Sequence, residues 1–442
     1  MSNVSIRVTK FGGTSLASAE QFRKVKEIIM NHPDRRYVVA SAPGKRFSDD
    51  IKVTDLLNQS YRLAASGEDY HPVLQKIHDR FSDILTDLEI SDFPLDEEIG
   101  IIAKHLEHAP NADYLASRGE YLNSKILARF LGYAFVDPAG LILFDDSGNL
   151  DSASTRNKLG DKLSETERAV IAGFYGSYYD GTVKTFTRGG SDITGSLVAM
   201  SVKADIYENW TDVSGMLAAD PRIVENPAPI EYISYQELRE LSYMGASVLH
   251  EDAVFPVRES GIPINIRNTN RPEDPGTIIM AKLKPEMSRN TVTGIAGKKG
   301  FSIIQIEKAL MNNEVGYVAK LLGILAKYEI SFDHVPTGID TVSVVVDTDT
   351  LHPVKREVIH EIFTELEPDT LFVETGISLI AVVGLGMIRT KGVAARTLKA
   401  ISDADINIRM LDQGSSELNI ILGVNDDDYE KAIRSIYREL WS

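Results

Sequence analysis

The C-terminal third of the chain contains two copies of one sequence unit, and this repeat restricts the possible folds more than any other feature. Residues 316–338 align without gaps to residues 392–414, at a constant offset of 76 residues (392 − 316). A fixed internal period is typical of a structural unit that occurs more than once. The identical pairs are Gly316/Gly392, Ala319/Ala395, Leu322/Leu398, Ile330/Ile406 and Gly338/Gly414.

Each copy has the pattern strand, helix, strand, strand, helix, because β-rich alternation and helical spacing follow one another in that order. The first copy can end in the strand "TLFVE" at residues 370–374, but no comparable strand follows the last helix of the second copy. We expect "TVTGIAG", residues 291–297, to supply it, which would insert the first small domain within the second. A second sheet with one strand fewer is the alternative.

The N-terminal part alternates short β-rich runs with helical segments. "IRVTKFGG" and "RYVVASAPG" are separated by "SAEQFRKVKEIIMNH", which has helical spacing and Ser18 as its cap. This alternation predicts a mainly parallel sheet covered by helices. Polar, proline-rich segments indicate a boundary near Lys284. We therefore expect a large α/β domain over 1–284, a linker and edge strand over 285–300, and small domains over 301–375 and 376–442.

The segment "TKFGGTS", residues 9–15, closes a strand with a lysine, two glycines and two hydroxyl residues. Adjacent glycines let the backbone approach another group closely, and Lys10 places a positive charge at the turn. The lysine and the peptide N–H groups are suited to holding a phosphate. An ordinary strand-to-helix turn with a cap is the alternative.

The segment "TRGGSD", residues 187–192, repeats this arrangement before an apolar helix. The planar guanidinium of Arg188 suits a carboxylate. Asp192 would repel a phosphate unless a lysine or Mg²⁺ lies between them, so it either orients Lys10 or caps the helix. Two basic-Gly-Gly-hydroxyl turns in one α/β domain favour phosphate binding.

Two further segments carry candidate polar groups. "WTDVSGMLAADPRIV", residues 210–224, predicts two turns after a strand, suited to a nucleotide's ribose and base. Glu120 in "SRGEYLNSK" is expected at the start of a helix. There it is either a first-turn carboxylate favoured by the helix dipole or a partner for a substrate ammonium group.

Charge and residue usage exclude several classes of protein. A formal net charge of −17 argues against nucleic acid or an anionic membrane as the main partner. The chain has no cysteine, which excludes disulfides, thiolate metal sites and cysteine nucleophiles. We find no signal peptide and no apolar run long enough to span a bilayer, which predicts a cytoplasmic protein.

Six blocks, in order and spread over nearly the whole chain, resemble the aspartate kinases. They are "TKFGGTS", "SAPGK…KVTDLL", "SRGEYLNSK", "TRGGSD", "WTDVSG…ADPRIV" and the paired repeats. The resemblance implies an α/β fold, an amino-acid-kinase-like mainly parallel sheet sandwiched by helices, followed by two βαββαβ (ferredoxin-like) ACT domains. It also implies phosphorylation of the L-aspartate β-carboxylate by ATP, with Mg²⁺ held largely by the nucleotide, as the first step of lysine, threonine and methionine biosynthesis. A kinase acting on another carboxylate, such as glutamate, and an amino-acid sensor without catalysis are the alternatives.

The resemblance also implies roles for individual residues, with Lys10 and Asp192 as the catalytic pair. Arg188 would bind the α-carboxylate of aspartate and Glu120 its amino group. The positions matched to aspartate are Ser41, Thr54, Glu120, Phe174 and Arg188. The positions matched to ATP are Lys10, Gly12, Gly13, Thr14, Ser15, Ser191, Asp212, Leu217, Asp220 and Arg222. Many relatives have a lysine in "GAKVLHP", whereas this chain has "GASVLHEDA" with Ser247, so that phosphate contact is not carried over.

ACT domains in this family pair between chains and bind an end-product amino acid, so we expect a homo-oligomer with lysine or threonine as effector. The positions matched to the effector sites of lysine-sensitive relatives are Met311, Tyr317, Ser331, Phe332, Asp333 and Thr337. Asp333 would hold the ammonium group of the effector. Its counterpart in the second copy is Arg409, so the two copies are not expected to bind one ligand in the same way.

Overall fold

A computed structural model describes residues 5–108, 110–187, 189–246, 249, 251–283, 287 and 290–442, with the side chains of 251–254 left out. The chain forms two compact units. One comprises Met1–Met216, Pro229–Tyr235 and Val248–Leu283, and the other comprises Leu217–Ala228, Gln236–Ser247 and Lys284–Ser442. The division is therefore not a single cut of the chain, because two short segments from the α/β region belong with the repeats.

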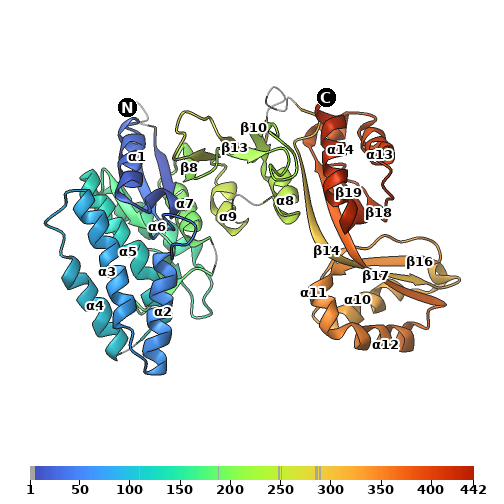
Figure 1. The fold of residues 1–442 in the computed structure, drawn as a ribbon, viewed down its shortest axis with the longest axis horizontal. Coiled ribbons are helices and arrows are strands. Elements are labelled where there is room, and N and C mark those ends of the chain that lie inside the picture. The colour runs from blue at the N-terminus through green and yellow to red at the C-terminus, as the bar shows by residue number, and fades with distance from the viewer. Residues whose placement is uncertain are drawn as a thin grey trace. The chain divides into compact units, whose positions relative to one another are not determined.

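The first unit has the expected alternation of strands and helices (Figure 1). Its strands are β1 (Arg7–Phe11), β2 (Arg35–Ala40), β3 (Ala134–Val136), β4 (Leu143–Phe144), β5 (Ala169–Ala172), β6 (Tyr175–Tyr178), β7 (Val183–Thr185), β8 (Ile206–Thr211), β10 (Pro229–Ile230), β11 (Tyr232–Ser234), β12 (Ile264–Asn268) and β13 (Thr277–Met280), with β9 (Met216–Leu217) at the division between units. Its helices are α1 (Ala19–Met30), α2 (Val53–Ser66), α3 (His71–Asp87), α4 (Leu95–His108), α5 (Ala112–Leu131), α6 (Ser152–Ser164), α7 (Gly190–Ser201) and α9 (Glu251–Glu259), while α8 (Tyr235–Tyr243) crosses the division.

An eight-stranded sheet in the order β11-β13-β12-β8-β1-β2-β5-β3 forms the centre of this unit. All neighbouring strands described as paired run parallel except β12 and β13. One face of the sheet contributes Phe11, Val38, Ala40, Val170 and Trp210 to a core shared with helices α1 to α5, which are coloured blue to cyan in Figure 1. Of these helices, α5 packs on β2, β3 and β5. Helix α7 packs on β1, β2 and β8 with α6 and α9 against it. The carboxyl ends of the parallel strands meet at one edge, where α/β proteins place their sites.

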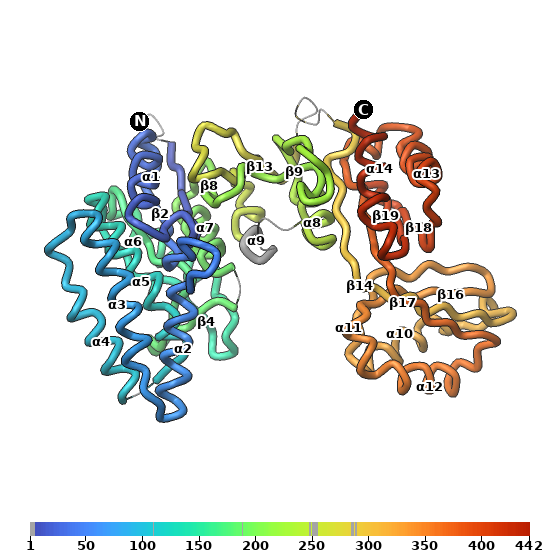
Figure 2. Tube along the Cα trace, viewed as in Figure 1, coloured from blue at the N-terminus to red at the C-terminus, as the bar shows by residue number. Residues whose placement is uncertain are grey.

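The second unit is built around two long strands. Its strands are β14 (Gly294–Glu307), β15 (Phe332–His334), β16 (Thr341–Asp347), β17 (Thr370–Val383), β18 (Met410–Asp412) and β19 (Asn419–Asn425), and its helices are α10 (Tyr317–Lys327), α11 (Thr348–Leu351), α12 (Lys355–Leu366), α13 (Val393–Asp403) and α14 (Tyr429–Trp441). The strand order is β15-β16-β14-β17-β19-β18, and all neighbouring strands run antiparallel. Figure 2 traces the chain through β14, β16, β17, β18 and β19.

Strand β14 joins the two repeats because each half of it pairs with a different half of β17. Residues 301–307 pair with 370–377, which belong to the first repeat. Residues 294–298 pair with 379–383, which belong to the second repeat. The edge strand of the second repeat therefore precedes the first repeat in the chain, and a sheet with one strand fewer is not what the structure shows.

Helix α8 joins the repeats through side chains that face them. Glu237 Oε1 accepts hydrogen bonds from Thr293 Oγ1 (2.6 Å) and from the backbone N–H of Leu385 (2.9 Å). Glu240 Oε2 accepts from Asn419 Nδ2 (2.6 Å). These contacts explain why residues 236–247 belong to the second compact unit.

Among the described residues, no helix is both long and apolar enough to cross a membrane.

Candidate active site

The ammonium group of Lys10 forms the centre of a small polar cluster. Its Nζ lies 2.6 Å from Asp192 Oδ1 on α7 and 3.5 Å from Asn209 Oδ1 on β8. Asn209 donates its Nδ2 to the same Asp192 oxygen (2.8 Å). The exposed fractions of the Lys10 and Asp192 side chains are 9% and 18%. Solvent and salt therefore screen this pair only weakly.

Of the two roles left open for Asp192, the geometry favours orienting Lys10. Gly189, at φ 59°, precedes α7 as its N-cap, and no side chain makes a capping hydrogen bond there. Asn209 was not anticipated, and only strand order reveals it. Because β8 lies beside β1 with Asn209 in register with Lys10, residues 199 positions apart in the chain meet.

The glycine turn after β1 crosses the turn after β2 at very close range. Gly44 donates its N–H to Gly13 O (2.8 Å), and Ser41 donates its N–H to Phe11 O (3.2 Å). A Cβ at position 44 would lie 2.6 Å from the carbonyl carbon of Gly13 and 2.8 Å from Thr14 N. The crossing therefore requires glycine, and it places Ser41 beside the predicted phosphate turn.

We expect Gly44→Ala to lower turnover by at least about tenfold, because the added methyl group has to push the two turns apart. Overpacking of this kind costs about 1–3 kcal/mol of stability. The measurement is steady-state turnover together with denaturant unfolding. Gly100→Ala in α4 is the control, since nothing lies within 4 Å of that position. Wild-type turnover in Gly44→Ala would show that the crossing does not shape the site.

Glu120 lies in the middle of α5, and the expectation that it starts a helix was wrong. The helix begins at Ala112 and is capped by Asn111, whose side chain accepts from Tyr114 N (2.9 Å). Glu120 is therefore beyond the first turn, where the helix dipole has little effect. Burial raises the pKa of Glu120 to about 8, although the backbone N–H groups of Ala42 and Glu120 itself act in the opposite direction.

The buried carboxylate of Glu120 lacks a partner that its chemistry requires. Its Oε2 is buried and makes no hydrogen bond. One turn further along α5, Asn123 donates its Nδ2 to Ser41 O (2.7 Å), while its own Oδ1 is also buried without a partner. A buried polar atom without a hydrogen bond lowers the stability of the fold, and a bound ligand can supply the missing hydrogen bond. Asn123 was not anticipated from the sequence.

The turn after β5 supports the start of α7. Phe174 has φ 79°, a strained conformation for this residue, and its N–H donates to Thr194 Oγ1 (3.1 Å). Gly190 lies against it, because a Cβ there would be 2.6 Å from the Phe174 ring. Ser191 in turn approaches Gly173. Strained residues of this kind are concentrated at functional sites.

The other predicted positions divide into two groups. In the first unit, Ser15 is buried and its Oγ lies 2.7 Å from Thr269 Oγ1, whereas Thr14 and Asp212 are exposed and Thr54 is the second residue of α2. Leu217, Asp220 and Arg222 belong to the second unit, where Arg222 and Asp220 form an ion pair (2.6 Å). Arg188 and Ser247 lie outside the described residues.

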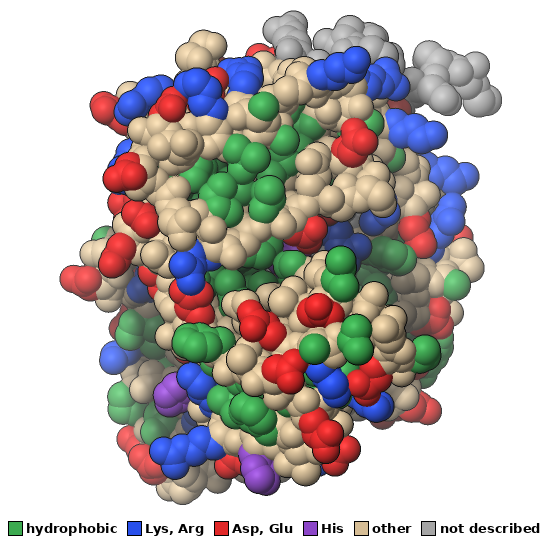
Figure 3. Space-filling model, turned by 90° about the vertical axis from the view of Figure 1, so that its right-hand side faces the viewer, with side chains coloured by type: hydrophobic (Ala, Val, Ile, Leu, Met, Phe, Trp, Pro, Cys, Tyr) green, Lys and Arg blue, Asp and Glu red, His purple; other side chains and the backbone are tan. Residues whose placement is uncertain are grey.

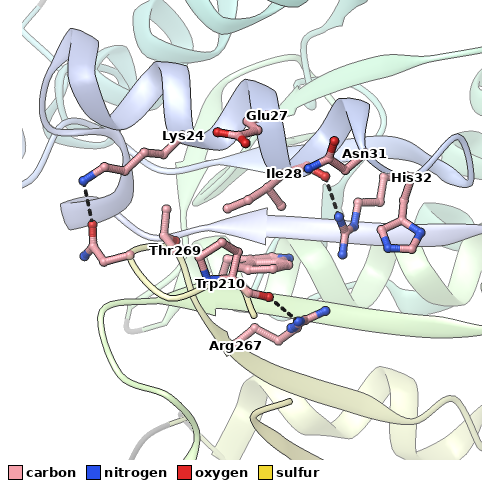
Figure 4. A pocket seen from close by; sticks show the side chains of 11 residues that line it. Lys24, Glu27, Ile28, Asn31, His32, Trp210, Arg267 and Thr269 are labelled. Carbon is pink, nitrogen blue, oxygen red and sulfur yellow. Dashed lines mark hydrogen bonds between the residues drawn. The ribbon is translucent and has the colours of Figure 1, made fainter. Parts of the chain in front are cut away.

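A pocket of about 280 Å³ in the first unit lies on the other face of the sheet from the Lys10 cluster. Figure 4 shows Trp210 between α1 and Arg267. At the rim, Lys24 donates its Nζ to Asn270 Oδ1 (3.2 Å). Trp210 pairs in register with Phe11 and stacks on it, and successive strand residues point to opposite faces. None of the sequence-predicted site residues lines this pocket.

The predicted effector residues differ in their surroundings. Met311 and Tyr317 belong to the apolar core of the first repeat, and the Tyr317 hydroxyl is buried without a partner. Ser331, Phe332 and Thr337 are exposed. The predicted effector residues therefore include two residues of the apolar core and three exposed residues in or near β15.

Asp333 and its counterpart Arg409 both have partners within the second unit. Tyr243 donates its hydroxyl to Asp333 Oδ1 (2.6 Å), and burial together with this carboxylate raises the pKa of Tyr243 to about 12. Arg409 pairs with Glu374 at 2.5 Å. The two equivalent positions therefore carry opposite charges and have different partners, a tyrosine hydroxyl for Asp333 and a carboxylate for Arg409.

Comparisons with known proteins agree with this fold. Residues 5–268 match the amino acid kinase family and residues 380–440 match an ACT domain. Aspartokinase 3 of Bacillus subtilis is 36% identical over 454 residues, covering 99% of both sequences. The crystal structure of Clostridium acetobutylicum aspartate kinase is 49% identical with a TM-score of 0.91, covering 99% of this chain and 100% of that one. Escherichia coli aspartokinase III, solved with aspartate and ADP and with lysine and aspartate, is 25% identical with a TM-score of 0.74, covering 99% of this chain and 100% of those chains.

The fold and these matches define a phosphotransferase of the amino acid kinase type, with an ACT domain in its C-terminal region. Within that class, this chain belongs to the aspartate kinase family.

Proposed function

We propose that this enzyme transfers the γ-phosphoryl group of ATP to the β-carboxylate of L-aspartate, giving 4-phospho-L-aspartate and ADP. A β-carboxylate oxygen attacks the γ-phosphorus while the bond to the β-phosphate oxygen of ADP breaks. The observation that carries the proposal is the partly buried Lys10–Asp192–Asn209 cluster, together with the buried Glu120 on α5, whose carboxyl group accepts from the backbone N–H of Ala42 in the turn after β2. The product would enter lysine, threonine and methionine biosynthesis as its first intermediate.

This reaction needs no general base from the protein. The attacking carboxylate has an ordinary pKa of about 4 and is ionised at neutral pH. The site has to bring two anions into line and neutralise the charge that develops on the phosphoryl oxygens. Lys10, kept oriented by Asp192 and Asn209, supplies positive charge, and the N–H groups of the turn after β1 supply hydrogen bonds.

Aspartate binding is proposed to complete the bonding of the unsatisfied groups on α5. The substrate ammonium would pair with Glu120, whose carboxylate has a free buried oxygen. Ser41, Thr54 and Phe174 would line the same space, and Arg188 would bind the α-carboxylate.

We propose that Mg²⁺ enters with ATP. Among the described residues, no group of three or more acidic or histidine side chains is arranged to hold a metal. The nucleotide phosphates would therefore supply most of the ligands, as is usual for Mg²⁺ at nucleotide sites. When bound, the ion supplies positive charge at the transferring phosphoryl group.

We propose lysine as the effector, with threonine as the alternative, because a lysine complex is known for the E. coli relative. We also propose a homo-oligomer formed through the ACT repeats. Apolar side chains gather in patches on the face drawn in Figure 3. In the second unit, Phe372 and Ile339 are 73% and 72% exposed.

The test is hydroxylamine trapping of the acyl phosphate with Mg-ATP, comparing L-aspartate with L-glutamate and then adding lysine or threonine. We expect hydroxamate with aspartate and a decrease when lysine is added. Hydroxamate with glutamate alone would identify a different carboxylate kinase. Nucleotide binding without hydroxamate from either substrate would favour an amino-acid sensor.

A further inference from the structure

Arg80 is a buried cation on a helix face that is otherwise apolar. It lies on α3 and is 5% exposed, with Ile77, Phe81 and Ile84 among its buried neighbours on the same helix. A buried guanidinium is costly unless hydrogen bonds and an opposite charge compensate it. The partners of Arg80 therefore show what the arginine does at this position.

The guanidinium of Arg80 connects the two turns that cross at Gly13 and Gly44. Its Nη2 donates to Ala17 O (3.1 Å), at the end of the turn after β1, and to Gly44 O (2.7 Å), in the turn after β2. Both acceptors are backbone carbonyl groups of residues outside the described helices and strands. One nitrogen atom thus joins two turns. The first comprises residues 12–17 and contains the predicted phosphate-binding residues Gly12 to Ser15 (the phosphate turn), and the second comprises residues 41–44 and contains Ser41, which is predicted to bind aspartate (the aspartate turn).

Asp50 balances the charge of Arg80 and extends the connection to the next segment. Arg80 Nη1 lies 2.5 Å from Asp50 Oδ2, and the same carboxylate accepts from the N–H and the Nε of Arg46 (both 2.9 Å). Burial acts to raise the pKa of Asp50, but its hydrogen bonds with Arg46 and Arg80 outweigh this effect and hold that pKa well below its usual range. The pair therefore stays ionised across the neutral pH range.

We infer that Arg80 is a positioning residue that sets the separation of the phosphate turn and the aspartate turn, and so the alignment of the two substrates. The inference rests on the proposed function, because it assumes that these turns hold ATP and aspartate. The planar fork of arginine directs donors along fixed directions, so that Nη2 meets both carbonyl groups while Nη1 meets Asp50. A lysine carries one compact ammonium group and has no such fork. Misplacing reacting groups by about 1 Å costs about 10²-fold in rate.

The first arm of the test compares Arg80→Lys and Arg80→Ala with the control Arg46→Ala. Arg46 pairs with the same Asp50 but contacts neither turn in the described hydrogen bonds. We expect kcat to fall about 10- to 100-fold in Arg80→Lys after correction for the folded fraction, with less than a threefold change in KM for ATP. Arg46→Ala should stay within about twofold of the wild type. Millimolar guanidinium should restore part of the turnover of Arg80→Ala and none of that of Lys10→Ala.

The second arm measures amide hydrogen exchange and does not depend on catalysis. In Arg80→Lys we expect faster exchange in residues 12–17 and 41–44 together, with unchanged exchange in β5 as a reporter of the intact core. Faster exchange in only one turn, or in neither, would overturn the inference. So would wild-type kcat in folded Arg80→Lys, or loss of kcat that merely follows the folded fraction. If the wild type makes no hydroxamate, the proposed function fails, and the exchange arm still decides whether Arg80 holds both turns.

Discussion

Lys10→Ala is expected to lower kcat by about 10³-fold or more while leaving the protein folded. The lysine is the one described cation that contacts Asp192 at the edge of the sheet, so its loss removes charge stabilisation from the transferring phosphoryl group. Removing one preorganised donor from such a site costs about 10²–10³ in rate, and a cation that acts on phosphoryl transfer costs about 10³–10⁵. The measurement is hydroxamate formation under saturating Mg-ATP and aspartate.

The control for this prediction is Lys24→Ala, which removes a lysine from α1 that pairs only with Glu20 and Asn270 among the described residues. It should keep turnover within about twofold. Thermal unfolding of Lys10→Ala should remain cooperative, because Asn209 still donates to Asp192. Turnover of Lys10→Ala within tenfold of the wild type would contradict the role of Lys10 as the phosphoryl contact.

Glu120→Gln is expected to weaken kcat/KM for aspartate by about 10²–10³-fold, because the substrate ammonium loses its only proposed charged partner. Leaving a buried charge unpaired at an interface costs about 2–5 kcal/mol, or about 30- to 5,000-fold, and the expected effect lies within these limits. In the wild type, Glu120 is protonated below its pKa of about 8 in the absence of substrate. Since binding of the ammonium group requires the ionised carboxylate, KM for aspartate should fall as pH rises from 6 to 8. This pH dependence should be absent in Glu120→Gln.

The same substitution should stabilise the protein at high pH. Because the folded-state pKa of about 8 lies above the ordinary value of 4.5, the folded chain binds more protons than the unfolded chain between these values. The free energy of unfolding therefore falls as pH rises through this window, by up to about 5 kcal/mol. The free energy of unfolding of Glu120→Gln should not fall over this pH range, so the variant should be more stable than the wild type at pH 8 and equally stable below about pH 4. Glu97→Gln on the exposed face of α4 is the control. Equal stability of Glu120→Gln and the wild type at pH 8 would contradict the raised pKa.

The repeat was sufficient to predict the architecture of the C-terminal region. Apolar positions offset by 76 residues indicated two equivalent units, and the structure shows matching helices and strands sharing β14 and β17. The division of the chain was not predictable in the same way. Residues 236–247 belong with the repeats, where Glu237 and Glu240 accept hydrogen bonds from residues more than 50 positions away in the chain.

The sequence pointed to candidate site residues where several polar groups share one turn, as in the segments containing Lys10 and Asp192. Their partners were not predictable, because Asn209, Asn123 and Arg80 lie in ordinary strand and helix patterns. Nothing in those patterns distinguishes a polar residue that faces solvent from one that faces a candidate catalytic turn.

The sequence alone determined the class of fold, the two repeats and the turns that carry the candidate catalytic groups, because periodicity and glycine placement are local properties of the chain. Only the tertiary structure decided that Lys10 pairs with Asp192 and Asn209, that Glu120 is buried with a raised pKa, and that Arg80 bridges two turns. The physical reason is that strand order and helix packing bring together residues far apart in the chain. Desolvation and hydrogen bonding at such contacts depend on that three-dimensional neighbourhood.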